Sequence, residues 1–264
     1  MTERRWGNLW LGLLVLTIGL LAWQYQDPHR IDLALRLTAP DAAHWLGTDQ
    51  LGRDVLSRVL EGAAVALGLA VVAVSLSALL GIAVGLLAGY RGGWFDAVLM
   101  RLVDMQLAIP SLLLALLVIA VLGAGAGNLL LVLVITGWTG YARIVRAEVL
   151  QLRSREFILG CQAIGASGLR IMGAHLLPNV VGGYMVVGTL SAARVVIIEA
   201  SMSYLGLGFQ PPVASWGRML VEGQVYVASA WWVVTFPGLA ILLAVLGANR
   251  LGAALKRRLQ RDGK

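Results

Sequence analysis

The sequence predicts an all-α protein, a multi-pass membrane helix bundle with about six transmembrane helices. Of its 264 residues, 59% are hydrophobic and only 13% are charged, which leaves too few polar groups to cover a soluble globule. Long apolar runs recur along the chain, and its basic residues lie mainly at the ends of these runs. Because the cations form no basic domain interleaved with aromatic residues, the net charge of +7 does not indicate nucleic acid as a partner.

The apolar runs give the expected spans, because a helix needs about 20 apolar residues to cross a hydrocarbon core about 30 Å thick. Six runs approach that length, at residues 7–23, 65–89, 105–122, 128–142, 179–199 and 231–248. The first follows two arginines, as a signal peptide would, but it ends in WQYQDP without a small-residue cleavage site. We therefore expect it to be retained as a helix.

The distribution of basic residues predicts the orientation, since Lys and Arg in short loops tend to remain cytoplasmic. With both termini inside, 15 of the 21 Lys and Arg residues lie on the cytoplasmic side and five lie outside, while Arg194 falls within the fifth span. We therefore expect both termini, and the loop at residues 153–178, to face the cytoplasm. The single cysteine, Cys161, permits no internal disulfide and so does not indicate the compartment.

This loop lies between the fourth and fifth spans and is more polar than the long apolar runs of the chain. Ser154 is placed to cap a short amphipathic helix that begins near Glu156, where a carboxylate favours the positive end of the helix dipole. Gly165 interrupts that helix, and a second short helix is expected from Gly168 up to Pro178. Two interpretations follow from these residues: a compact knob that docks in a groove of another protein, or a helix that rests on the membrane surface.

The stretch REFILGCQAIGASGLRIMGAHLLPN closely resembles the EAA loop of bacterial ABC-importer permeases. Gly160 and Cys161 stand where that family has two alanines, Gly165 where it has its glycine, and the pair Leu177-Pro178 where it has a closing Leu-Pro. Leu159 departs from the family, which has an acidic residue at this position. The resemblance implies a coupling helix that enters a cleft on a cytoplasmic ATPase. The expected coupling residues are Glu156, Leu159, Gly160, Cys161, Ala163, Gly165, Ala166, Leu177 and Pro178.

Two further stretches resemble the C-type permeases of dipeptide, oligopeptide and nickel importers. HWLGTDQLGRDVLSRVLEGA, at residues 44–63, is similar to that group's segment before its second span, and residues 199–220 are similar to its segment after the fifth. The resemblance implies a type I ABC-importer permease in the inner membrane of a bacterium. It divides the chain into residues 1–64, with a first helix and an external amphipathic segment, and a core permease domain at 65–264.

The same resemblance implies the partners and the mechanism. A second homologous permease, two cytoplasmic ATPase subunits and an external substrate-binding protein would assemble with this chain in the lipid membrane, and ATP-driven alternating access would import small peptides or a metal chelate such as nickel. The chain has no GxxxxGK[ST] phosphate loop, so it is expected to be no enzyme and to bind no cofactor, with ATP and Mg²⁺ on the ATPase subunits. The alternatives are an ion-gradient-driven secondary transporter or channel, which predicts paired acids in mid-span, and a membrane enzyme.

Charged residues at membrane depth are the remaining functional candidates. Arg194 and Glu199 lie within or near the fifth span, where a charge is costly and turns inward. Two interpretations stay open: Arg194 faces a water-filled pathway or a partner subunit, or the two residues form a structural ion pair, although a spacing of five is not ideal for contact. Near the third span, Arg101 and Asp104 are spaced to pair, and Pro110 predicts a bend.

Three features outside these sites carry structural expectations. Gly81, Gly85 and Gly89 repeat the GxxxG spacing, which allows close packing within the chain or against a second permease. LGRDVLSRVLEGA predicts an amphipathic helix whose polar face meets water or polar partners. Residues 203–220 are too rich in Gly and Pro for one helix. His29 and His44 give only a weak indication of a metal site, since their spacing is not that of ligands.

Overall fold

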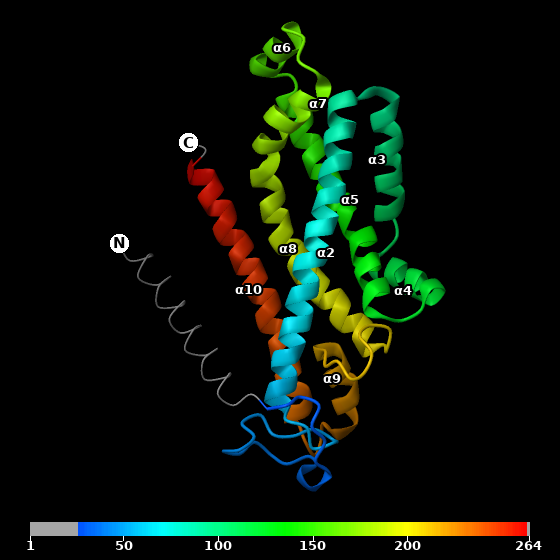
Figure 1. The fold of residues 1–264 in the computed structure, drawn as a ribbon, viewed down its shortest axis with the longest axis vertical. Helices are drawn as coiled ribbons and strands as arrows, with labels where there is room; N and C mark the ends of the chain where they lie inside the picture. The colour runs from blue at the N-terminus through cyan, green and yellow to red at the C-terminus, as the bar shows by residue number, and fades with distance from the viewer. Residues whose placement is uncertain (1–25, 263–264) are drawn as a thin grey trace. The chain divides into compact units, whose positions relative to one another are not determined.

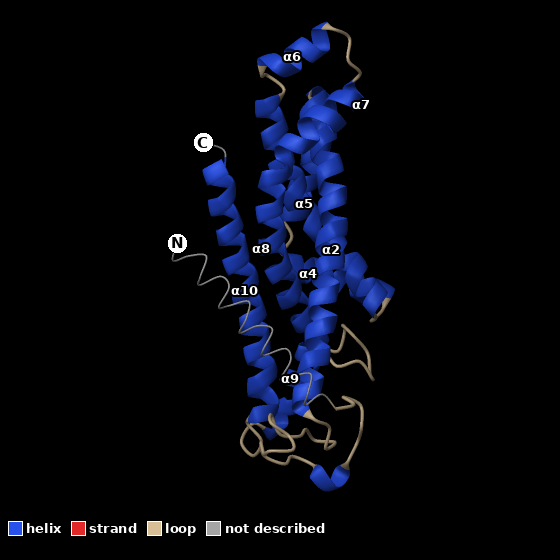
Figure 2. Ribbon diagram, turned by 60° about the vertical axis from the view of Figure 1, so that its left-hand side comes forward, coloured by secondary structure: helices blue, strands red, loops and turns tan. Residues whose placement is uncertain are grey.

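The computed structural model describes residues 26–262, and these are helical with no β-strand beyond an isolated bridge between Thr48 and Asp54 (Figure 2). Four helices in this range are long and apolar enough to cross a membrane, and a bent pair of helices raises the number to five. The four are α2 (Val55–Arg91), α5 (Ala126–Leu152), α8 (Leu177–Tyr204) and α10 (Trp232–Asp262). The all-α, multi-pass fold class is thereby confirmed, while the span predicted at 7–23 lies outside the described residues.

The span expected at residues 105–122 is not one straight helix. The chain instead forms α3 (Gly93–Leu107) and α4 (Ser111–Leu122), which meet at an angle of 89°. The break lies at Pro110, which lacks a backbone N–H and disfavours a helical conformation at the residue before it. Sequence analysis located this bend, but the apolar run gave no indication of how sharp it is.

The chain divides into two compact units, which we describe separately. In the described range, unit 1 contains residues 26–65 together with Pro211–Ala240, and unit 2 contains Ala66–Gln210 together with residues 241–262. Residues 55–65 of α2 belong to unit 1 and the remainder of that helix belongs to unit 2.

In unit 2, α2 and α5 approach each other closely through the three glycines of the GxxxG repeats (Figure 1). A Cβ atom added at Gly81 would lie 2.4 Å from the Trp138 carbonyl oxygen, and one at Gly85 would lie 2.7 Å from that of Ala142. Since real Cβ atoms do not come this near to backbone, only glycine permits the observed separation. The repeats therefore serve packing within this chain.

Helices α3 and α5 are joined by polar side chains. The Arg146 guanidinium donates two hydrogen bonds to Asp96, with Nε–Oδ1 and Nη2–Oδ2 distances of 2.5 and 2.6 Å. Asp104 accepts from Arg143, so the pairing of Asp104 with Arg101 expected from sequence is replaced by one between helices. Two charges that meet as a bidentate pair carry much less desolvation penalty than isolated ones, which makes them acceptable near a membrane.

Unit 1 contains a network of five charged side chains around a nearly inaccessible aspartate. The members are Asp49, Arg53, Arg58, Arg218 and Glu222. Asp49 accepts from both Arg53, at 2.7 Å, and Arg58, whose side chain is only 3% exposed. Glu222 lies on α9 (Trp216–Gly223), so these ion pairs connect residues 49–58 to a helix far along the sequence.

The polar face predicted for LGRDVLSRVLEGA meets protein rather than water. Asp54, Ser57 and Arg58 are all buried, and Asp54 accepts hydrogen bonds from the Ser57 amide and hydroxyl at 2.8 and 2.7 Å. His44 is also buried, with its Nδ1 3.0 Å from Asp54 Oδ1. The helix beginning at Val55 continues without a break into the span, so the segment is not a separate amphipathic helix.

Aromatic side chains complete unit 1. The indole N–H of Trp216 donates to the Val59 carbonyl at 2.9 Å, and that of Trp232 donates to the Thr48 carbonyl at 3.1 Å. The short 3-10 turns η1 (Leu33–Leu35) and η3 (Gln224–Tyr226) lie in its connecting segments, and Arg36 lies over the Tyr226 ring. As expected, residues 203–220 form no single helix, since α8 ends at Tyr204 and α9 begins at Trp216.

The close contact of α2 with α5 predicts that alanine substitutions at two glycines of α2 affect stability very differently. Gly85→Ala forces a methyl group against the α5 backbone and should lower stability by about 1–3 kcal/mol, the range for overpacking. Gly68→Ala is the matched control, because nothing lies within 4 Å of its added Cβ and alanine is the better helix former. Thermal unfolding of the detergent-solubilised protein measures both, and equal melting temperatures would contradict the assigned contact.

The charge network predicts sensitivity to acid. Burial raises the pKa of Glu222, but the charges of Arg58 and Arg53 and the hydrogen bond from Arg218 outweigh it, so the pKa lies below its ordinary value of 4.5. A carboxyl group with a lowered folded-state pKa stabilises the fold above its ordinary pKa, and this stabilisation is lost as the pH falls through the folded-state value.

The melting temperature should therefore fall as the pH is lowered below about 4.5, the ordinary pKa of the group, and Glu222→Gln should remove part of that dependence while lowering stability at neutral pH. Glu156→Gln, an exposed position in unit 2, should leave the acid dependence unchanged. Identical pH profiles for wild type and Glu222→Gln would show that the network does not carry this effect.

Candidate functional site

The first candidate site is the segment that joins α5 to α8 in unit 2. It contains α6 (Glu156–Ala163), which lies beyond the ends of α5 and α8 in both views (Figures 1 and 2). The expected Ser154 cap is wrong: Arg155 occupies the N-cap position, and the Ser154 hydroxyl donates to the Gln151 carbonyl at 3.0 Å. Glu156 is in the first turn, as predicted, and faces solvent.

One fully buried side chain anchors α6 to the unit. Ile158 packs in a cluster that draws residues from α2, α5, α8 and the segment before α8. The cluster consists of Leu86, Val145, Val149, Ile158, Ile171, Leu176 and Val180. Cys161, Ala166 and Leu177 are partly buried against it. These contacts connect α6 to the spans through an apolar core instead of through a flexible linker.

The glycine turn at the end of α6 has the geometry that the sequence predicts. Gly165 has φ +78°, a left-handed conformation that favours glycine. Its N–H donates to the Gln162 carbonyl and the Ala166 N–H donates to the Cys161 carbonyl, both at 3.0 Å. This pair of hydrogen bonds is the Schellman motif, which satisfies the carbonyls at a helix end and gives α6 a fixed stop.

The second half of the segment differs from the expected separate helix. Ser167 caps α7 (Gly168–Arg170), which continues through a π-helix, η2 (Ile171–Leu176), directly into α8. Pro178 lies in the first turn of α8, directly after η2. The chain from Gly168 onward is therefore one helical path, because proline begins the α-helical part without interrupting it.

The side chains of this segment divide by exposure. Leu159 is 50% exposed, Ile164 84% and Leu169 79%, which is unusual for large apolar residues. Gly160, Ala163, Gly165 and Pro178 are also exposed, and no atom lies within 4 Å of a Cβ added at Gly160. The predicted coupling residues thus fall into an exposed, mostly apolar surface and a half-buried set, Cys161, Ala166 and Leu177, that holds it.

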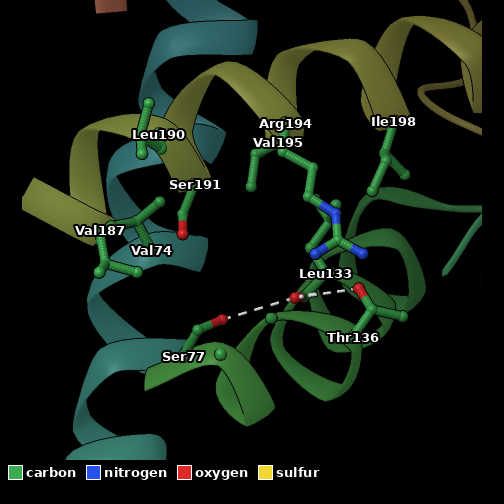
Figure 3. Close-up of a pocket in the computed structure, with 12 residues that line it drawn as sticks. Val74, Ser77, Leu133, Thr136, Val187, Leu190, Ser191, Arg194, Val195 and Ile198 are labelled. Atoms are coloured by element: carbon green, nitrogen blue, oxygen red, sulfur yellow. Dashed lines mark hydrogen bonds between the residues drawn. The ribbon is translucent and has the colours of Figure 1, made fainter. Parts of the chain in front are cut away.

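The second candidate site is a cavity of about 220 Å³ inside unit 2, between α2, α5 and α8 (Figure 3). Arg194 projects from α8 into it and points toward Leu133 and Thr136 of α5. Ser77 and Thr136 donate to the Leu133 carbonyl at 3.5 and 3.3 Å. The remaining lining is mainly aliphatic.

Arg194 and Glu199 have different surroundings. Glu199 is fully buried and accepts a hydrogen bond from the Ser203 hydroxyl at 2.7 Å. Arg194 is exposed in the isolated chain and lines the cavity, which Glu199 does not. The geometry gives these two residues separate places on α8, as their spacing of five positions implies.

Sequence analysis did not identify the hydroxyl groups of the cavity, Ser77, Thr136 and Ser191. One signal for Ser191 exists, since Val187, Ser191, Arg194 and Ile198 follow the i, i+4, i+7, i+11 spacing of one helix face and all line the cavity. Ser77 and Thr136 lie on other helices, so only the packing brings them to this face.

Within residues 26–262, no group of three or more His, Cys, Asp and Glu side chains is arranged to hold a metal ion. The histidines discussed as weak candidates have carboxylate neighbours: His44 contacts buried Asp54, and His29 Nε2 lies 3.4 Å from Glu61 Oε1. His175 lies in the first candidate site, with its Nε2 3.7 Å from Cys161 Sγ.

Comparison with known proteins supports both the fold and the sequence interpretation. Residues 81–261 match the family described as binding-protein-dependent transport system inner membrane component. The solved structure of the MetNI methionine ABC transporter, in inward-facing conformations, contains a chain similar in fold, with a TM-score of 0.57 at 17% identity. The match covers 75% of this chain and 96% of that one.

Relatives with known names are more similar in sequence. The dipeptide transport system permease protein DppC of Alkalihalophilus pseudofirmus is 40% identical over 84% of this chain and 73% of its own. The nickel transport system permease protein NikC of Escherichia coli K12 is 36% identical over 97% of this chain and 94% of its own. The oligopeptide transport system permease protein OppC of Bacillus subtilis is 39% identical over 82% and 71%.

The Schellman turn predicts opposite effects on hydrogen exchange for Gly160, inside α6, and Gly165, just after it. Gly165→Ala places a Cβ in the left-handed region and should destabilise the end of the helix by about 1–2 kcal/mol, or roughly five- to thirtyfold faster local exchange of amide hydrogens. Gly160→Ala lies in the helix with open space around it and should slow exchange. Hydrogen exchange resolved at residues 156–166 measures both, and equal rates would refute the role of the turn.

Proposed function

Because the chain belongs to the binding-protein-dependent transport system inner membrane component family, among the permeases of peptide and nickel ABC importers, we propose that it couples ATP hydrolysis elsewhere to the movement of cargo through alternating access. The cargo is a small peptide or a metal chelate such as nickel. The relatives are permease subunits, and this chain likewise is a membrane permease and not itself an enzyme.

The observation that carries the proposal is the construction of α6 and its neighbours. Three large apolar side chains, Leu159, Ile164 and Leu169, are exposed on a segment that Ile158 anchors in the core. An exposed apolar surface on a rigid, short helix is suited to a groove on a partner protein. A helix lying on the membrane would present one continuous apolar face to lipid, whereas here the buried residue of α6 faces the core of its own unit.

The partner of this surface is a cytoplasmic ATPase subunit. Two such subunits, carrying ATP and Mg²⁺, work with this chain, a second homologous permease and an external substrate-binding protein. This chain itself binds no nucleotide and no metal cofactor. Residues 153–178 and both termini lie on the cytoplasmic side of a bacterial inner membrane, in agreement with the excess of Lys and Arg on that side.

The proposed coupling residues have two tasks. Glu156, Leu159, Gly160, Ala163 and the exposed end of α6 contact the ATPase. The half-buried residues Cys161, Ala166 and Leu177 transmit the displacement to the core, while Gly165 ends α6 and Pro178 lies where η2 passes into α8. Closure of the ATPases on ATP then moves α6 and switches the pathway between inward and outward opening.

The same proposal assigns roles to the two parts of the chain. Residues 65–264 form the core permease domain, and residues 1–64 add the first helix and an external segment. The rival function, an ion-gradient-driven secondary transporter or channel, is not favoured: the two carboxylates of α3, Asp96 and Asp104, are each paired with an arginine of α5.

A single substitution on the exposed surface tests the docking. Ile164→Asp places a carboxylate where the ATPase would bury an apolar side chain, and it should lower the amount of co-purifying ATPase at least about tenfold, equivalent to roughly 1.4 kcal/mol. Ile31→Asp is the matched control, because Ile31 is 58% exposed in unit 1, away from this segment.

The same variants are compared for ATP-dependent uptake of a labelled dipeptide into vesicles. Both proteins should insert and fold equally, as judged by melting temperature, while only Ile164→Asp loses uptake. Unchanged ATPase recovery and uptake in Ile164→Asp would overturn the proposed docking surface. Uptake by the purified chain alone under a proton or sodium gradient would favour the rival.

A further inference from the structure

The cavity of unit 2 has one charged wall. On α8, Ser191 and Arg194 are three residues apart and therefore share a helix face, which Val187 and Ile198 extend on either side. Figure 3 shows the Ser191 hydroxyl and the Arg194 guanidinium directed to the same space. On the opposite side of the cavity lie the hydroxyls of Ser77, from α2, and Thr136, from α5, and both residues are buried.

The charge of Arg194 is not balanced from within the cavity. None of the described residues that line the cavity is acidic. Three carboxylates of α3 and α8 have partners of their own: Asp96 pairs with Arg146, Asp104 pairs with Arg143, and Glu199 accepts a hydrogen bond from Ser203.

A guanidinium near mid-span is costly unless water or an anion accompanies it. Arg194 falls at the middle of the apolar part of α8, Tyr184–Tyr204. An arginine that enters a cavity and has no acid beside it there leaves a place for a negatively charged ligand.

We propose that Arg194 and Ser191, with the hydroxyls of Ser77 and Thr136 opposite, form a carboxylate-binding subsite that receives a negative group of the cargo during its passage. The inference rests on the proposed transport function and names the chemistry of one step in it. A guanidinium offers a planar fork of N–H donors that matches the two oxygens of a carboxylate. The hydroxyls of Ser77 and Thr136 already donate to the Leu133 carbonyl, so they make the opposite wall polar without adding a donor.

The size and lining of the cavity set the class of ligand. About 220 Å³ holds several water molecules, and so accepts a carboxylate with the atoms next to it. Because the lining is mainly aliphatic, the cavity has few groups that could hydrogen-bond to a larger polar ligand. A free carboxylate is common to a peptide terminus and to an organic chelator of a metal ion. A single subsite of this kind binds weakly, which suits a ligand that must leave again.

A carboxylate of the second permease subunit is the competing occupant. It would neutralise Arg194 permanently, and the cavity would then be closed to small anions in the assembled transporter. The two cases differ in whether added carboxylates reach the subsite, and this difference decides the experiment.

The test uses the full chain, purified with the subunits that accompany it. Two substitutions are made in this chain: Cys161→Ser removes the native thiol, and Ser191→Cys places a new thiol in the cavity. Two methanethiosulfonate reagents, one with a sulfonate and one with a trimethylammonium group, report the local charge. A unit charge nearby should favour the anionic reagent by about fivefold or more, as roughly 1 kcal/mol of Coulomb energy implies.

Arg194→Gln should abolish this preference for the anionic reagent. Arg194→Lys should keep it, because the charge remains. Arg101→Gln is the matched control, since Arg101 is an exposed cation on α3, which does not line the cavity. A preference that does not change in Arg194→Gln would overturn the proposal.

Protection by small ligands then identifies the chemistry. Millimolar dialanine should slow modification of the new cysteine, its C-terminal amide should not, and Arg194→Gln should remove the protection. Protection by nickel citrate, with none by dialanine, would support the same subsite with a chelate carboxylate as its ligand. Equal protection by dialanine and its amide, or a thiol that neither reagent reaches in the assembled complex, would overturn it.

The cysteine-labelling experiment needs no ATP, so its outcome can be distinguished from that of the coupling experiment. A failed subsite leaves ATPase recovery and the effect of Ile164→Asp unchanged, whereas a failed coupling proposal leaves the charge preference at Ser191→Cys in place. A final comparison measures transport directly: Arg194→Gln should lower the dipeptide imported per ATP hydrolysed while the ATPase subunits still co-purify.

Discussion

The contact of α2 with α5 through Gly81, Gly85 and Gly89 is the constraint on which the rest of unit 2 depends. Between helices in lipid there is little hydrophobic driving force, so stability comes from close packing and from polar contacts. The glycines let the two backbones touch, and the residues of α5 that face them, Tyr141 and Val145, become fully buried as a result. Residues of α6, η2 and α8 then pack in one cluster with side chains of α2 and α5.

Several polar side chains of unit 2 are held by contacts between helices. Gln106 donates to the Ile135 carbonyl and accepts from the Trp138 indole, at 2.5 and 3.0 Å, and Asp96 is held by Arg146. Each of these groups has its partner on another helix of the same unit, as the scarcity of water at membrane depth requires. Arg194 differs, because its guanidinium extends into a cavity whose described lining contains no acid. The contrast separates polar groups that hold the bundle together from one that, under the proposal above, meets a ligand.

The sequence predicted the features that depend on local properties. Apolar length located α2, α5, α8 and α10, and the position of Gly165 indicated a turn that proves to have φ +78°. Features that depend on contacts between distant residues escaped it. The burial of Arg58 follows from its pairing with Asp49 and with Glu222, 164 residues away in the chain, and no local pattern reports such a partner.

The errors in element boundaries have a similar origin. The amphipathic and the apolar parts of α2 have the same helical period, so the change of composition near residue 64 does not mark an end of the helix. Ser154 met the composition rule for a cap, yet the helix began one residue later than that rule requires. The cavity could not be predicted because it needs the register of three helices, of which sequence gives only the face of α8.

The two candidate sites are connected by α8 itself. Ile158 of α6 and Ile171 and Leu176 before α8 belong to one buried cluster, so a displacement of α6 cannot leave the start of α8 unmoved without opening that cluster. From Leu177 the helix is continuous past Arg194, roughly 25 Å farther along at 1.5 Å per residue. The wide turn of the π-helix at Ile171–Leu176 lies between them, in the kind of conformation often found at functional positions. Under the proposed function, a push on α6 therefore reaches the carboxylate subsite as a movement of one wall of its cavity, while the glycine contact of α2 with α5 keeps the opposite walls together.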